Sequence, residues 1–111
     1  MTLLSDLETM FDNMRSQTSW NVDGNLLWGY FFFDPSPAKL QALAAVLEQS
    51  NYKIANLYPS DDETTHVLHL EKIETHSPQS LFVRNDELQQ LAAQHGVASY
   101  DGMDVGPIDL I

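Results

Sequence analysis

The chain has 111 residues, which suits one domain and leaves little room for two. Its 16 acidic residues outnumber 5 basic ones, and the net charge of −11 repels nucleic-acid backbones and anionic lipid surfaces. The absence of cysteine excludes disulfides, thiolate metal sites and cysteine nucleophiles.

Two interpretations of the acidic charge stay open, solubility and attraction of a basic partner.

The cellular location is predicted from the absence of targeting and membrane-spanning segments. No basic region precedes a long apolar core at the start of the chain, so we expect no signal peptide. No apolar run approaches the roughly 20 residues that span a bilayer, so we expect a cytoplasmic protein with no membrane partner.

A helix is predicted first, over residues 2–17. Residues 18–25 follow as a loop, because Asp23-Gly24-Asn25 is a turn-forming sequence. Apolar side chains recur in the helix at steps of three and four residues, the spacing of an amphipathic helix: Leu3, Leu7, Met10 and Met14.

The stretch LLWGYFFFD, residues 26–34, predicts a strand in the middle of a sheet. Its aromatic residues favour a pleated, buried backbone. Both faces of the stretch are apolar, which is typical of a central strand that is covered at least in part on both sides. One face carries Trp28, Tyr30 and Phe32, and the other carries Leu27, Phe31 and Phe33.

The remaining elements repeat one pattern, a helix that begins at a Ser-Pro pair and is followed by a strand. Ser36 is a good N-cap, and Pro37 suits the first helical position because its missing N–H has no partner there. Ser77-Pro78 repeats this start before a helix that Gly96 ends. Strands are predicted over residues 52–58, 65–75 and 97–105, with a loop over 59–63.

The order of these elements predicts an α+β fold, namely a ferredoxin-like βαββαβ sandwich with an additional N-terminal helix. We expect a single domain over residues 1–111, with the helix at 2–17 and the sandwich at 26–107. The strands at 26–34 and 65–75 are expected to be central, with two helices on one face of the sheet. We expect the N-terminal helix, or a second copy of the chain in a homodimer, to cover the other face.

Two carboxylates lie in the stretch SYDGMDVGP, residues 99–107. Its glycines do not form a phosphate loop, because no lysine and no helix follow them. Asp101 and Asp104 have the chemistry of an acid and a base, but the sequence supplies neither with a partner. The stretch therefore predicts a last strand with a glycine bulge at Asp101-Gly102, in a protein that is not an enzyme and has no catalytic residues.

Histidines and acids also gather in THVLHLEKIETHS, residues 65–77. His66 and His76 are separated by about 33 Å along an extended strand, so they cannot share one metal ion. His69 and Glu71 are neighbours on one face but supply only two ligands. We expect no metal and no cofactor. A small-molecule or metal-binding enzyme that uses His69, Glu71 and Asp101 is the alternative.

Tyr30 and Phe32 raise an RNA-binding hypothesis, since RNA-recognition modules stack bases on aromatic side chains of a four-stranded sheet. Such modules need grouped basic residues to hold the RNA backbone, and this chain has no such motif. We therefore expect no direct binding of nucleic acid and assign these aromatic residues to the core. The basic residues are Arg15, Lys39, Lys53, Lys72 and Arg84.

Four stretches of the sequence resemble one known family. They are YFFFDP in the first strand, LxxLA in the helix after it, ETHSPQSL before the last helix, and GVASYDGMDVGP at the last strand. Over roughly residues 26–107 they resemble the RraB family, regulators and inhibitors of ribonuclease E, most strongly at Tyr100-Asp101-Gly102. Met103 stands where better-known members have a tryptophan, and the chain ends at IDLI without their acidic tail, so we expect a shorter member.

The resemblance implies an acidic, cytoplasmic, ferredoxin-like protein that binds ribonuclease E and modulates RNA degradation. The non-catalytic half of such a ribonuclease contains basic disordered stretches, which an acidic globule is able to mask. The family supplies no catalytic residues to carry over. A structural dimer with a different client is the alternative. The candidate partner-binding residues are Asp61, Asp62 and Glu63 in a loop, and Tyr100, Asp101 and Asp104 in the last strand.

Overall fold

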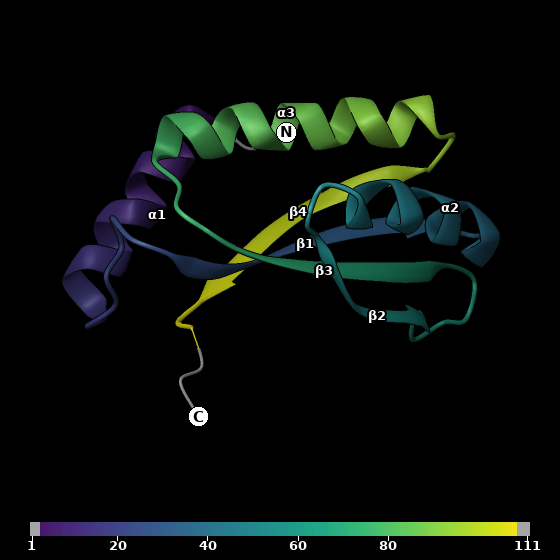
Figure 1. The fold of residues 1–111 in the computed structure, drawn as a ribbon, viewed down its shortest axis with the longest axis horizontal. Coiled ribbons are helices and arrows are strands. Elements are labelled where there is room, and N and C mark those ends of the chain that lie inside the picture. The colour runs from purple at the N-terminus through teal and green to yellow at the C-terminus, as the bar shows by residue number, and fades with distance from the viewer. Residues whose placement is uncertain (1–2, 109–111) are drawn as a thin grey trace.

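The computed structural model describes residues 3–108 and contains both helices and strands (Figure 1). Three helices and four strands are formed in this part of the chain. In chain order they are α1 (Leu4–Gln17), β1 (Leu26–Asp34), α2 (Pro37–Glu48), β2 (Lys53–Pro59), β3 (His66–Glu74), α3 (Pro78–Gln94) and β4 (Ser99–Gly106).

The four strands form one antiparallel sheet in the order β2-β3-β1-β4. β1 and β3 are the central strands, as the sequence predicts, and β2 and β4 are the edges. β1 pairs with β3 along its whole length, from Leu26 opposite Glu74 to Asp34 opposite His66. The prediction of a mixed α+β fold is confirmed.

The starts of α2 and α3 follow from local sequence. Ser36 caps α2 by accepting a backbone hydrogen bond, and Pro37 occupies the first turn. Ser77 and Ser80 cap α3 reciprocally, because the side-chain oxygen of each accepts from the backbone N–H of the other. Gly96 ends this helix with φ of 68°, a left-handed conformation that glycine adopts without strain.

The apolar core lies between the sheet and the helices. Trp28, Tyr30 and Phe32 of β1 are fully buried on this face of the sheet. Full burial of a large apolar side chain contributes about 1.5 to 3 kcal/mol relative to exposure. The helical leucines that belong to the same buried cluster are Leu7, Leu40, Leu43, Leu47, Leu81 and Leu88.

The N-terminal helix joins the helical layer, so the expectation that it covers the open face of the sheet is wrong. Phe11 of α1 is fully buried, and its ring stacks on Trp28 with the ring centroids 6.0 Å apart. α1 also contacts α3, and Figure 1 shows it beside the start of that helix. The apolar side of α1 therefore packs against the indole of Trp28, on the face of the sheet that α2 and α3 also cover.

The opposite face of the sheet is open within residues 3–108. Leu27, Phe31 and Phe33 are only half-buried there, and Ile73 of β3 is 55% exposed. The rings of Phe31 and His69 stack on this face with their centroids 4.4 Å apart. In the described part of the chain, helices thus cover one face of β1, and no helix packs on the other face.

Candidate functional site

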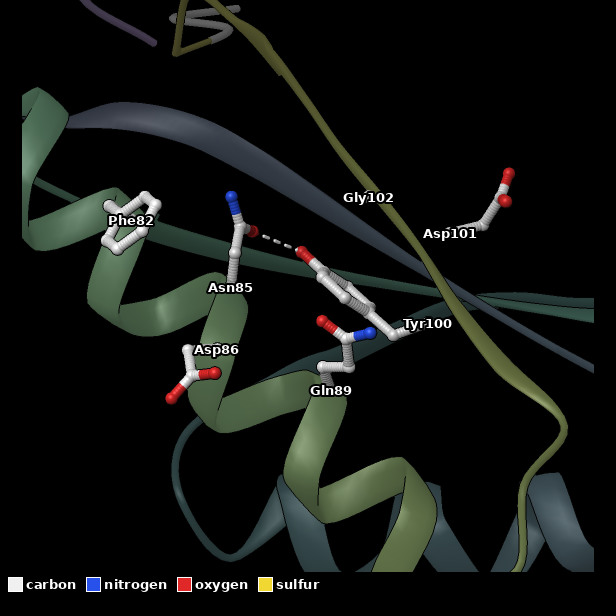
Figure 2. Close-up of a pocket in the computed structure, with 7 residues that line it drawn as sticks. All are labelled: Phe82, Asn85, Asp86, Gln89, Tyr100, Asp101 and Gly102. Atoms are coloured by element: carbon white, nitrogen blue, oxygen red, sulfur yellow. Dashed lines mark hydrogen bonds between the residues drawn. The ribbon is translucent and has the colours of Figure 1, made fainter. Parts of the chain in front are cut away.

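A groove runs between α3 and the beginning of β4, at the Tyr-Asp-Gly sequence (Figure 2). Its cavity volume is about 180 Å³. The lining includes two aspartates and two side-chain amides, but no histidine, serine or lysine of the described residues lines it. This chemistry suits binding of a hydrogen-bond donor or a cation and supplies no nucleophile with a base. The lining residues are Phe82, Asn85, Asp86, Gln89, Tyr100, Asp101 and Gly102.

Tyr100 forms a wall of this groove. Its ring packs against Phe32 with the centroids 5.1 Å apart, and its hydroxyl donates to Oδ1 of Asn85 at 2.6 Å (Figure 2). The Asn85 amide in turn donates to Sδ of Met103 at 3.5 Å. Burial raises the pKa of the Tyr100 phenol, so the hydroxyl stays protonated and donates. Tyr100 thus ties β4 to α3 at the groove.

The predicted glycine bulge is confirmed at Asp101 and Gly102. The pairing of β4 with β1 shifts there, between the partners of Phe31 and Phe32. Gly102 has φ of 103°, which a side chain would strain. Asp101 is exposed, and Figure 2 shows its carboxylate on the side of β4 away from α3. The bulge therefore aims Asp101 outward while Tyr100 points into the groove.

Asp104 lies elsewhere, on the open face of the sheet. It is paired with Gly29, whose missing side chain leaves room for Asp104 and for the ring of His69. These two residues line a separate hollow with Glu71. The alternative enzyme site of His69, Glu71 and Asp101 is not assembled, because Asp104 takes the place assigned to Asp101. Within residues 3–108, no three histidine, aspartate or glutamate side chains are grouped so that they could hold a metal ion.

The loop acids occupy a third place, the connection between β2 and β3. Asp61 and Asp62 line a hollow with Phe33. The Ser60 hydroxyl donates to Oδ1 of Asp62 at 2.6 Å and lowers the pKa of that carboxylate, which also accepts from the Thr64 N–H at 3.1 Å. Asp62 therefore shapes the turn. The six candidate partner-binding residues are thus spread over the groove, the open face and this loop.

A buried polar cluster beneath α3 was missed by the sequence analysis. The Tyr30 hydroxyl donates to Glu74 Oε2 at 2.6 Å and lies 3.1 Å from Nε2 of His76. Arg84 donates to both oxygens of Glu74 at 2.9 Å and to the Tyr52 hydroxyl at 2.8 Å. The signal was available, since the acid and the tyrosine share the helix-facing side of paired strands. The cluster stabilises the packing of α3 on the sheet.

The chemistry of this cluster is that of a neutralised ion pair. Burial alone would raise the pKa of Glu74, but hydrogen bonds from His76 and Tyr30 and the charge of Arg84 outweigh it and lower that pKa to about 2. Burial also raises the pKa of Tyr30, with the hydrogen bond to Glu74 as the second cause. Glu74 is therefore ionised and Tyr30 protonated at neutral pH, and neither is available as an acid or base.

We expect the acid side of the stability profile to depend on Glu74. Its pKa falls from 4.5 to about 2 on folding, so its contribution is complete above the higher value and disappears as the pH drops toward the lower one. Urea unfolding between neutral pH and the acid limit measures this loss. The Glu74→Gln variant should show a shallower acid limb, and Glu48→Gln, the same change at an exposed acid, should leave the limb nearly unchanged. Identical limbs in Glu74→Gln and the wild type would contradict the assignment.

Comparison with known proteins adds a family to this geometry. The family model described as Regulator of ribonuclease activity B, RraB, matches residues 5–105. The match reaches from the first turn of α1 to the end of β4, so it includes the N-terminal helix as well as the sheet. No curated protein matches the chain. None of the helices in residues 3–108 has the length and apolar character needed to cross a membrane.

Proposed function

The chain belongs to the RraB family, as the resemblance predicts, and from that premise we propose that it regulates a ribonuclease by binding the enzyme. We take the enzyme to be ribonuclease E and the outcome to be modulated RNA degradation in the cytoplasm. The protein acts without catalysis of its own. We also take the whole chain as one domain of ferredoxin-like type, which the strand order β2-β3-β1-β4 supports.

Beside the family match, this proposal is carried by the contacts that the few basic residues make within the protein. Arg84 is committed to the buried cluster, and Arg15 pairs with Asp23 at 2.6 Å. Lys39 and Lys72 donate to the backbone carbonyls of Gly96 and Ser50 at 3.3 Å and 3.0 Å. The acidic excess therefore dominates the surface field, which favours a basic protein partner and disfavours a phosphate backbone.

We propose that the partner is contacted through two acidic surfaces. The first is the loop between β2 and β3, with Asp61, Asp62 and Glu63, all exposed. The second is the strand β4, with Tyr100 in the groove, exposed Asp101 at the bulge and exposed Asp104 on the open face of the sheet. Charged groups at the rim of an interface mainly accelerate encounter and select partners of opposite charge. Binding should accordingly weaken as the salt concentration rises.

Reversal of charge at β4 tests the function. The double variant Asp101→Lys/Asp104→Lys should weaken binding to ribonuclease E by about tenfold or more at low salt, because four units of charge change at the surface. Isothermal titration calorimetry of the purified protein with the full enzyme measures the affinity. An enzyme lacking its disordered non-catalytic half and free RNA are titrated alongside.

The matched control is Glu48→Lys, an exposed charge reversal on α2. It should alter affinity much less than either single reversal at β4, Asp101→Lys or Asp104→Lys, each of which changes the charge by the same two units. Salt-sensitive binding to the full enzyme alone supports the regulator proposal. Absence of binding to either form of the enzyme overturns it. Equal losses in all variants would show that net charge matters and that these surfaces do not.

A structural homodimer is the second candidate, and one observation favours it. The open face of the sheet carries half-buried Phe31 and Phe33 beside the 55% exposed Ile73. Apolar side chains grouped on one face often mark an interface. Light scattering of the purified protein distinguishes a monomer from a dimer. The charge of −11 on each copy opposes self-association, and we therefore prefer the regulator.

A further inference from the structure

The outer edge of β4 is free of hydrogen-bond partners within residues 3–108. β4 pairs with β1 on one side only, as an edge of the sheet. No turn, loop or cap contributes a backbone hydrogen bond to Ser99–Gly106 in the described part of the chain. After the bulge, the register from Gly102 to Gly106 against β1 is unbroken. A regular edge of this kind presents alternating N–H and C=O groups to a further strand.

The two edges of the sheet differ in how far they are protected from adding a strand, because β4 is interrupted only at its bulge. β2 carries Lys53 at its start and Pro59 at its end, and its pairing with β3 is interrupted between Ile54 and Asn56. Lysine, proline and irregular pairing are the devices that protect edge strands from adding a partner. β4 has neither lysine nor proline within Ser99–Gly106, and its bulge leaves the second half of the strand regular.

Hollows lie beside both ends of this regular edge. The polar groove under α3 meets β4 at Tyr100 and Gly102. A second hollow, with a cavity volume of about 430 Å³, meets β4 at Val105 under α1 and is walled by Met10, Met14 and Trp20. Methionine side chains adapt to ligands of different shape. Recognition by strand addition uses this combination, because main-chain bonds supply affinity while pockets for alternate side chains supply specificity.

The acidic residues on and beside β4 indicate which kind of segment is able to pair with it. Asp101 and Asp104 lie on the strand itself, Asp86 lines the groove and Asp6 lines the apolar hollow. Among residues 3–108, no lysine or arginine lines either hollow. A second copy of the chain would bring its own aspartates against these, and like charges opposite each other in a sheet are destabilising. A basic segment meets complementary charge along the same path.

We propose that β4 is a docking edge at which an extended basic segment of the partner protein adds as a further strand of the sheet. An apolar side chain of that segment enters the hollow under α1, and a basic side chain enters the groove under α3. This inference rests on the proposed function for the identity of the partner. It adds the surface, the conformation of the bound segment and the chemistry of its side chains.

The test uses a synthetic peptide of about nine residues that alternates lysine or arginine with valine or leucine. It should slow amide hydrogen exchange in Gly102–Gly106, measured by NMR on the intact protein, and leave the open face unchanged. A peptide of the same sequence with alternate N-methylated amides keeps every charge but cannot pair, and should bind about tenfold more weakly. Equal affinity of the two peptides, or protection confined to another surface, would overturn the proposal.

A pair of variants tests the hollow under α1 without disturbing the core. Thr9 lines it, whereas Ser16 on the same helix does not. Both are exposed, and both hydroxyls donate back to a carbonyl of the helix. Thr9→Arg should weaken binding of the basic peptide by about fivefold or more through charge repulsion, and Ser16→Arg should weaken it less. Equal effects of the two variants would contradict a segment seated in this hollow.

Hydrogen exchange on the complex with ribonuclease E separates the two proposals. Protection of Gly102–Gly106 in that complex supports both. Enzyme binding with protection only at the open face overturns the docking edge and leaves the regulator intact. Peptide binding at β4 with no binding of the enzyme overturns the regulator and leaves β4 as a docking edge for basic segments.

Discussion

Replacement of Arg84 by methionine should lower the free energy of unfolding by about 3 to 5 kcal/mol, the usual loss when one partner of a buried ion pair is removed. The Glu74 side chain is only 13% exposed and would retain a negative charge without its cation. The Tyr52 hydroxyl would lose its donor as well. Urea denaturation followed by tryptophan fluorescence measures the loss, since Trp28 lies in the core.

The control is an arginine whose ion pair is exposed. Arg15 pairs with Asp23 at 2.6 Å, and the two side chains are 46% and 77% exposed. Arg15→Met should therefore cost less than about 1 kcal/mol. The double variant Arg84→Met/Glu74→Gln should recover part of the loss, because it removes both buried charges. Similar losses for Arg84→Met and Arg15→Met would show that burial does not govern the pair.

Replacement of Phe11 by alanine should lower the free energy of unfolding by about 3 to 5 kcal/mol, as for other fully buried aromatic side chains. Phe11 is 0% exposed and stacks on Trp28, so its loss leaves a cavity between α1 and the sheet. The same denaturation experiment measures the change. A large effect would show that α1 is an integral part of the core.

Val83→Ala serves as the matched control on α3. Val83 is 54% exposed, so its truncation opens no cavity and should change stability by less than about 0.5 kcal/mol. If Phe11→Ala behaved like this control, α1 would be an appendage on an independently stable sandwich. The family match from residue 5 onward agrees with an integral helix.

The candidate site was predictable only in its local features. The bulge at Asp101-Gly102 follows from the residues themselves, because glycine alone adopts φ of 103° without strain. The direction of the Asp101 carboxylate and the wall formed by Tyr100 depend on the register with β1 and on the position of α3. A stretch of nine residues reveals neither the register with β1 nor the position of α3. Asp101 and Asp104 therefore could not be assigned to different surfaces from the sequence.

Polar contacts between residues far apart in the chain could not be predicted from the sequence either. Asp34 at the end of β1 is 3% exposed because it accepts from the N–H of Ser36 at 2.7 Å and from that of Ala98 at 2.8 Å. The first bond is local and follows from the helix start that the sequence predicts. The second spans the fold. A buried carboxylate needs such partners, but the chain position that supplies them appears only after the strands are placed.

The amino-acid sequence by itself determined the helices, the strands, the two central strands and the mixed α+β class, because periodicity, caps and turn residues act within a few positions. Only the tertiary structure decided that α1 packs on Trp28 and that Glu74 and Arg84 meet beneath α3. The physical reason is that an apolar stripe or a charge specifies what it needs to contact, but not which of several distant surfaces supplies it.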